Sequence, residues 1–123
     1  MSQALYIGID IGTSSVRCSA INSQRQLIAT SKADLPLPEN PQPGWHEQDA
    51  HCWWTKTQAS LAGLLTQIDP LLVRAIAIDG TSSTVLLTDD SNQPVSPALM
   101  YNDSRATEIM DELYQFVPSD SIT

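Results

Sequence analysis

LYIGIDIGTSSVR, residues 5–17, is the stretch that decides the fold of this chain. Its apolar residues over 5–11 predict a β-strand, and the Gly-Thr-Ser sequence at 12–14 predicts a tight turn. Residues 16–21 then alternate with a period of two, which predicts a second strand. We therefore expect a hairpin in which the carboxylate of Asp10 stands at the end of the first strand, directly before a polar turn.

Each part of this hairpin has a use in binding phosphate. Gly12 permits a sharp turn because glycine tolerates a positive φ, and successive backbone amides exposed in such a turn form a concavity for anions. Thr13 and Ser14 add hydroxyl donors. Asp10 suits a hydrated Mg²⁺, and Arg17 can orient a neighbouring carboxylate or a phosphate oxygen. The simpler interpretation is a plain hairpin with a glycine turn and an exposed aspartate.

Two better-known phosphate loops are excluded. A Gly-x-x-x-x-Gly-Lys-Ser/Thr sequence is absent, since the two lysines, Lys32 and Lys56, do not follow a glycine turn. The glycines at 8 and 12 also miss the Gly-x-Gly-x-x-Gly spacing of dinucleotide folds. Both of those motifs open a helix, whereas this turn joins two strands, so a different kind of nucleotide site is indicated.

The following residues predict a third strand, a loop and a helix. Residues 22–25 predict a turn and residues 26–31 the third strand. Four prolines within residues 35–44 predict an extended surface loop. Asp49 is expected as the N-cap of a helix that Asp69-Pro70 ends. The apolar side of this helix is expected to comprise Trp54, Leu61, Leu64, Leu65 and Ile68.

The second half completes an α/β pattern. Residues 73–78 predict a strand parallel to the first, because a strand, a helix and a strand in that order form a crossover unit. The first strand is apolar on both faces, which suits a central, covered position. A hairpin turn is expected at 89–92 and an amphipathic helix at 103–116. The buried side of that helix is expected to carry Ile109, Leu113 and Phe116.

The amino-acid composition limits the classes of partner that the protein is expected to bind. The net charge is -8 with six basic residues, which makes nucleic acid and anionic membranes poor partners. No apolar run has transmembrane length, and the N-terminus enters a strand without a signal-peptide core. Cys18 and Cys52 are expected as free thiols, and the protein as cytoplasmic.

The turn has an echo later in the chain. Residues 9–15 read IDIGTSS and residues 78–83 read IDGTSS, and each is followed by a strand pattern and a polar turn. A polyol needs neutral donors and acceptors at short range, which Ser82, Ser83 and Thr84 can supply. Two similar hairpins of which only one is functional remain the alternative.

Three motifs together resemble one family. The first is Asp10 to Arg17, the second is GWHEQD at 44–49 followed by two tryptophans, and the third runs from AIAIDGTSST at 75–84 to YNDSRA at 101–106. In order and spacing they are similar to the FGGY carbohydrate kinases, members of the actin-like, ribonuclease-H-like ATPase superfamily. Ala50 departs from the proline usual at that position in the family.

The resemblance implies a fold and an activity. The fold is α/β of ribonuclease-H-like type, a mixed sheet with covering helices. The activity is transfer of the γ-phosphoryl group of ATP to a sugar hydroxyl. Within the family, the small hydroxyl-bearing sequence at residues 80–83 is most similar to ribulose- or xylulose-type pentulose kinases.

The resemblance also assigns roles. It implies that ATP phosphates lie at Gly12, Thr13, Ser14 and Arg17, that Mg²⁺ lies at Asp10, and that sugar lies at a second set of residues, which comprises Ser82, Ser83, Tyr101 and Asp103. Tyr101 has packing at a strand end as its alternative, and Asp103 has capping of the last helix.

Length indicates a fragment. Residues 1–123 would form only the N-terminal part of the first of two family domains, incomplete on its C-terminal side, with the general base beyond Thr123. A homodimer of the full-length protein is left open. A non-kinase nucleotide switch of actin-like type and a non-catalytic interaction fragment are the alternative functions.

We predict that the isolated 123-residue chain transfers no phosphate, because it lacks the general base and the adenosine site that the resemblance implies. Incubation with Mg-ATP and a panel of pentuloses, followed by assay for sugar phosphate, tests this. Robust turnover by the isolated chain would contradict the interpretation as a fragment.

Overall fold

The computed structural model describes residues 3–117. The main sheet comprises β1 (Leu5–Ile11), β2 (Ser15–Asn22), β3 (Leu27–Asp34) and β5 (Val73–Gly80). A small second sheet pairs β4 (Glu47–Gln48) with β6 (Ala98–Leu99). The helices are α1 (Ala50–Leu65) and α2 (Met110–Phe116), with the 3₁₀ helices η1 (Pro70–Leu72) and η2 (Arg105–Ile109).

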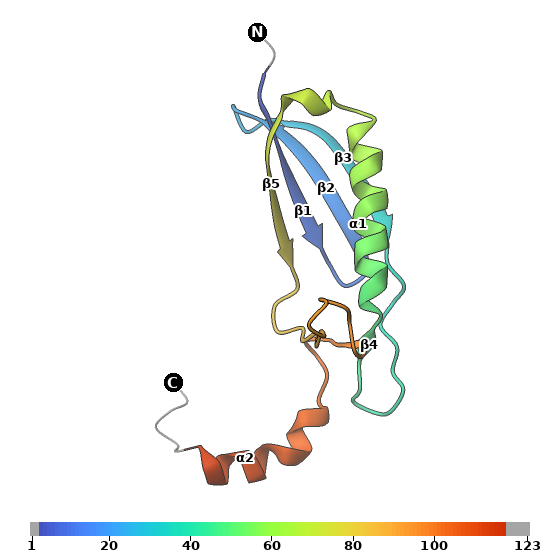
Figure 1. The fold of residues 1–123 in the computed structure, drawn as a ribbon, viewed down its shortest axis with the longest axis vertical. Coiled ribbons are helices and arrows are strands. Elements are labelled where there is room, and N and C mark those ends of the chain that lie inside the picture. Colours follow the sequence, from blue (N-terminus) through green and yellow to red (C-terminus); the bar gives the residue numbers. More distant parts are fainter. Residues whose placement is uncertain (1–2, 118–123) are drawn as a thin grey trace.

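Strand β1 is central in the main sheet, whose order is β3-β2-β1-β5 (Figure 1). It pairs antiparallel with β2 and parallel with β5, so the predicted crossover is confirmed. Because parallel strands end at the same edge, Ile11 lies opposite Gly80 in the register, and the turns that follow both strands leave the sheet together.

Helix α1 covers one face of the sheet, and the core lies between them. Asp49 caps the helix as predicted, because its side chain accepts the amide of His51. Alternate residues of β1 and β2 point into the core, as the period of two requires. The buried side chains of this core are those of Ile7, Ile9, Val16, Cys18, Ala20, Ala29, Leu35 and Leu64.

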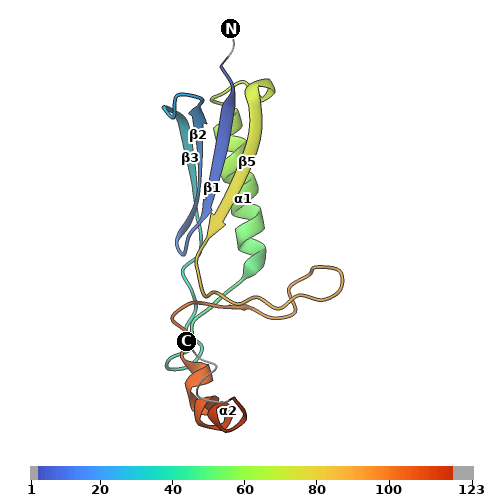
Figure 2. The same ribbon diagram turned by 90° about the vertical axis from the view of Figure 1, so that its left-hand side faces the viewer.

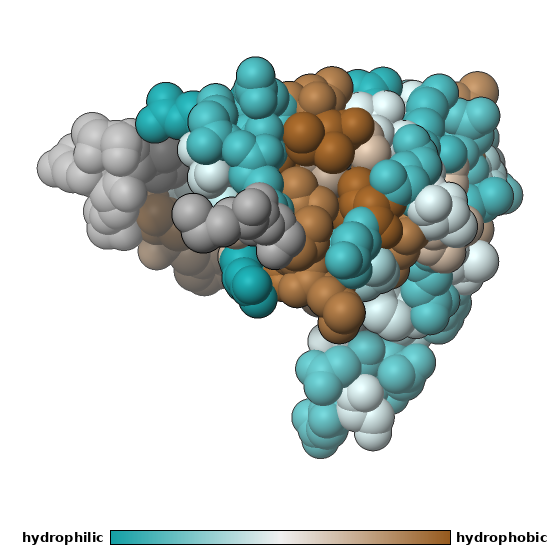
Figure 3. Space-filling view, turned by 90° about the horizontal axis from the view of Figure 1, so that it is seen from above, coloured by the Kyte–Doolittle hydropathy of each residue, from teal (hydrophilic) through white to brown (hydrophobic). Residues whose placement is uncertain are grey.

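The opposite face of the sheet is open among residues 3–117 (Figure 2). Tyr6, Gly8 and Asp10 of β1 are exposed there, so the expected covering of β1 on both faces is not met by the described part of the chain. Ile78 on β5 is in register with the buried Ile9, so it lies on the helix side of the sheet, where it is 67% exposed. Apolar surface gathers at the end of the molecule that carries η1 (Figure 3), where Leu71 is exposed.

Several sequence-based bounds were wrong. The third strand extends to Asp34 because its ladder with β2 continues to Ser15. Helix α1 ends at Leu65, and Asp69 caps η1 instead of ending α1. Trp54 is 67% exposed, whereas Trp53 packs against the core, because Trp53 rather than Trp54 follows the helical period of the buried residues.

The second half is less regular than predicted. The expected turn at 89–92 is confirmed, since the Asp89 carboxylate accepts the amides of Ser91 and Gln93. The predicted last helix is a 3₁₀ turn followed by the short helix α2. Its expected buried side is exposed, up to 82% at Phe116, and α2 lies apart from the sheet (Figure 1). No helix of the described chain is both long and apolar enough to cross a membrane.

We predict that Leu64→Ala lowers the free energy of unfolding of the chain by about 2–5 kcal/mol, because it leaves a cavity under a fully buried side chain. Gln58→Ala, on the exposed side of α1, is the control and should change it by less than about 0.5 kcal/mol. Urea unfolding followed by circular dichroism measures both. Equal effects would contradict the assignment of the core face.

Candidate functional site

The turns after β1 and β5 meet at one open pocket. This pocket has a volume of about 170 Å³ and is lined by Ile11, Gly12, Gln48, Trp53, Gly80, Thr81 and Thr84. The two similar sequences therefore come together in space, which the parallel register of β1 and β5 explains.

The first turn has a different backbone from the one predicted. Within residues 3–117, Gly44 is the only glycine with a positive φ, so Gly12 does not use that freedom. The Gly12 amide donates to the carbonyl of Ser15 at 3.0 Å and is not exposed for an anion. A Cβ on residue 12 would lie 3.2 Å from that carbonyl oxygen, so glycine permits this close approach.

The amides of Thr13 and Ser14, in the same turn, are available to bind an anion. Neither the Thr13 nor the Ser14 amide donates a hydrogen bond to another described residue. The carbonyls are engaged instead: the Ser14 carbonyl accepts the Leu35 amide at 2.9 Å, and the Thr13 carbonyl accepts Nε2 of Gln48 at 3.0 Å. Consecutive free amides beside engaged carbonyls form an anion-binding concavity.

Asp10 and its counterpart Asp79 differ in their contacts. Asp10 is exposed and forms no hydrogen bond or ion pair with the described residues, although Arg17 lies opposite it on β2. The Asp79 carboxylate accepts the amide of Gly80 at 2.8 Å. Both aspartates and Arg17 line a shallow hollow of about 370 Å³ on the open face of the sheet. Asp10 is thus the freer carboxylate for a hydrated cation.

The predicted sugar residues fall into two groups. Ser82, Ser83 and Tyr101 are exposed, and their hydroxyls form no hydrogen bond within the described chain. An antiparallel bridge joins Val85 to Leu99, which brings the segments of Ser83 and Tyr101 side by side. Asp103 is the other group, because its carboxylate is almost fully buried.

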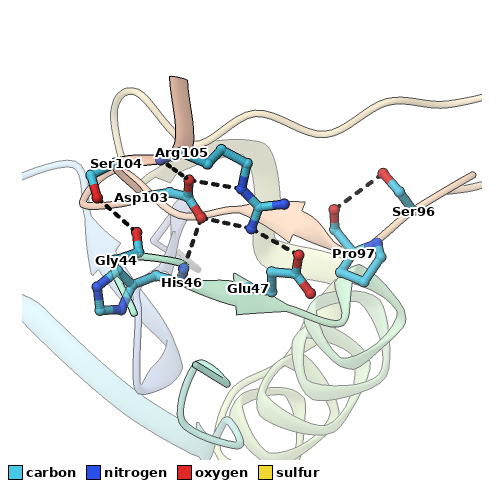
Figure 4. Close-up of polar contacts among 8 residues, drawn as sticks. All are labelled: Gly44, His46, Glu47, Ser96, Pro97, Asp103, Ser104 and Arg105. Carbon is cyan, nitrogen blue, oxygen red and sulfur yellow. Dashed lines mark hydrogen bonds and ion pairs between the residues drawn. The ribbon is translucent and has the colours of Figure 1, made fainter. Parts of the chain in front are cut away.

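Both oxygens of the Asp103 carboxylate accept hydrogen bonds from residues of the same chain (Figure 4). Its Oδ2 accepts the amide of His46 at 2.7 Å and Nη2 of Arg105 at 2.7 Å. Its Oδ1 accepts both the amide and Nε of Arg105, at 3.0 and 2.8 Å. Ser104, not Asp103, is the N-cap position of the last helical segment. Asp103 therefore fastens the segment after β6 to the loop before β4.

Arg105 is the centre of the same cluster. Its Nη2 also bonds Oε1 of Glu47 at 2.8 Å, and its guanidinium stacks on the ring of Trp45, 3.8 Å from the centroid. Hydrogen bonds from this guanidinium hold the pKa of Asp103 well below its usual range, while the pKa of Arg105 is raised further by the same contact.

Sequence reasoning missed the roles of Glu47 and Gln48. Glu47 faces Arg105, and Gln48, 4% exposed, faces the first turn. Opposite directions for neighbouring residues follow from the alternation of a strand. A signal was present in the sequence, since two long polar side chains stand together between a proline-rich loop and a helix cap.

The mixed sheet, its crossover helix and a polar turn after the first strand define an α/β protein of ribonuclease-H-like fold. The FGGY family of carbohydrate kinases, N-terminal domain, matches residues 5–122. The chain belongs to this family, and the predicted fold class is confirmed.

Relatives and solved structures agree with this family assignment. The chain is 35% identical to a xylulose kinase of Klebsiella pneumoniae over 104 residues, covering 85% of this chain and 21% of the relative. It is 32% identical to a xylulose kinase of Escherichia coli (strain K12), covering 96% and 24%. The crystal structure of xylulose kinase from Rhodospirillum rubrum superposes with a TM-score of 0.85 at 29% identity, covering 95% and 24%. The chain thus spans about a quarter or less of these proteins.

We predict that Asp103→Asn destabilises the chain at neutral pH and that the difference from the wild type shrinks in acid. Because the pKa of Asp103 is lower in the folded chain, its contribution is present above the unfolded value, about 3.9, and is lost as pH falls through the lower folded value. Thermal unfolding between pH 7 and pH 2 measures this. Asp90→Asn, in the exposed turn, is the control, and a gap that is constant with pH would contradict the prediction.

Proposed function

We propose that the polypeptide carrying this chain is an ATP-dependent sugar kinase that phosphorylates a hydroxyl of a pentulose of the ribulose or xylulose type. The carrying observation is that two similar turns leave the sheet at the same edge, the first with two amides and a preceding carboxylate that have no partner among the described residues, and the second with hydroxyls that have none. The pocket between the turns is lined by Gly12 of the first and by Gly80, Thr81 and Thr84 of the second. The xylulose kinases among its relatives support the pentulose class. In this proposal, residues 1–123 form the N-terminal part of the first kinase domain.

The first turn is proposed to hold the phosphates of ATP. The free amides of Thr13 and Ser14, with their hydroxyls, suit phosphate oxygens, and the exposed Arg17 adds a cation on the same face as Asp10. Asp10 would hold hydrated Mg²⁺, since a single free carboxylate matches an ion that keeps several waters. When bound, this ion neutralises charge on the transferring phosphoryl group.

The second turn is proposed to hold the sugar. Ser82 and Ser83 offer neutral hydroxyls, and Tyr101 offers a ring for the C–H face of a sugar together with its own hydroxyl. We assign Asp103 the role of holding the segment that carries Tyr101, because its oxygens already accept four hydrogen bonds.

In the reaction, the sugar oxygen bonds to the γ-phosphorus, the bond to the leaving ADP oxygen breaks, and a general base takes the hydroxyl proton. We assign that base to no residue of this chain.

We predict that the first turn serves ATP and Mg²⁺ and that the second turn serves the sugar. The test uses the full-length polypeptide. Asp10→Asn should lower turnover by orders of magnitude while sugar binding survives, because the charge that holds Mg²⁺ is lost. Ser82→Ala with Ser83→Ala should weaken sugar binding by about 1–3 kcal/mol, with ATP affinity little changed. Calorimetric titration with sugar and with Mg-ATP, beside steady-state kinetics, measures each effect.

Asp79→Asn is the matched control for Asp10→Asn, because the Asp79 carboxylate already accepts the backbone amide of Gly80. The assignment is reversed if the serine changes abolish nucleotide binding while Asp10→Asn spares turnover. ATP hydrolysis that no polyol affects would instead favour a nucleotide switch of actin-like type.

A further inference from the structure

Among residues 3–117, Gln48 is the one buried amide side chain that touches the first turn, and nothing in the proposed chemistry uses it. It extends from β4, which lies at the start of α1 (Figure 1). Its Nε2 donates to the carbonyls of Thr13 at 3.0 Å and Pro36 at 2.7 Å, and its Oε1 accepts Nε1 of Trp53 at 2.7 Å. A buried polar group with this many partners is fixed in place.

The orientation of this amide has no alternative. Carbonyl oxygens only accept and an indole N–H only donates, so Nε2 must face Thr13 and Pro36 while Oε1 must face Trp53. The three partners come from the turn, the proline-rich loop and α1. Gln48 therefore holds the Thr13 carbonyl at a position set by the core helix and the loop together.

We infer that Gln48 is a positioning residue for the phosphate turn. A trans peptide unit is planar, so its C=O and the next N–H point in opposite directions. Drawing the Thr13 carbonyl toward Gln48 turns the Ser14 amide away from the protein interior, where it has no described partner. The Leu35 amide holds the Ser14 carbonyl, which fixes the following peptide unit as well.

Without the Gln48 donor, the Thr13–Ser14 peptide unit could rotate toward other donors and remove one amide from the anion concavity. This inference rests on the proposed function for the identity of the anion, a nucleotide phosphate. It does not rest on that function for the direction of the amide, so the two can be tested separately.

The test uses Gln48→Glu in the full-length polypeptide. A glutamate keeps the shape and the acceptor for Trp53 but loses both donations from Nε2. We expect KM for Mg-ATP to rise about tenfold or more, with KM for the sugar within about twofold, because small displacements of positioning groups carry such costs. Gln48→Met, which has no donor and no charge, should reproduce the rise and guards against an effect of the added charge.

Asn22→Asp is the matched control. Asn22 is also a buried amide with two donated and two accepted hydrogen bonds, to Gln3, Gln24 and Gln26. It lies at the other end of β2, six register positions from the turn, which is roughly 20 Å. The same chemical change there should lower thermal stability without altering KM for Mg-ATP.

A spectroscopic measurement tests the direction of the amide without any activity. In the full-length polypeptide, labelling of threonine carbonyl carbons and serine nitrogens isolates the signals of Thr–Ser peptide units, of which residues 1–123 contribute three, Thr13–Ser14, Thr30–Ser31 and Thr81–Ser82. Gln48→Glu and Gln48→Met should shift the Thr13–Ser14 signal and leave the other two in place, and Asn22→Asp should leave Thr13–Ser14 in place.

An unshifted Thr13–Ser14 signal in both Gln48 variants overturns the inference, as does a loss of stability with KM for Mg-ATP unchanged. A wild-type polypeptide that neither binds Mg-ATP nor transfers phosphate overturns the proposed function alone, and the carbonyl signal then decides the role of Gln48. The two failures are thus distinguishable.

Discussion

Parallel pairing of β1 with β5 determines where the two candidate turns lie. The register sets Ile11 opposite Gly80, so both strands release their turns at one edge. That pairing also requires a crossover, and α1 supplies it while burying one face of the sheet. Had β5 run the other way, the two similar turns would lie at opposite ends of the sheet.

The two-residue strand β4 adds the second constraint. Glu47 turns toward Arg105 and the segment after β6, and Gln48 turns toward the first turn. Neighbouring residues of one strand thus contact both parts of the candidate site. Gln48 is buried, so its contacts are costly to lose, because an unpaired buried donor or acceptor carries its full desolvation penalty, whereas Glu47 and Arg105 are partly exposed.

Sequence patterns predicted structure well where neighbouring residues of the sequence determine it. The β1 hairpin, the cap at Asp49 and the crossover followed from periodicity and turn residues, and each was confirmed. Trp54 was assigned to the wrong side of α1 because aromatic neighbours at 53 and 54 blur the period. The length of β3 depended on its partner strand.

Long-range side-chain contacts could not be predicted. The sequence offered Asp103 as a sugar ligand or a helix cap, and its actual partners, His46 and Arg105, become visible only when β4 and β6 pair. Gly12 was correctly placed in a turn for the wrong reason, since close approach to Ser15 rather than a positive φ favours glycine there. Such reasons depend on which atoms the fold brings together.

Gly44 shows how tightly the loop before β4 is joined to the segment after β6. Its φ is positive, its carbonyl accepts the amide and the hydroxyl of Ser104, and a Cβ at this position would collide with the Ser104 hydroxyl oxygen. Two segments sixty residues apart are thus joined at a point that has room for a hydrogen atom and no more. Any side chain at residue 44 would have to displace Ser104. The glycine of the Gly-Trp dipeptide that opens the second motif is thus explained by a tertiary contact.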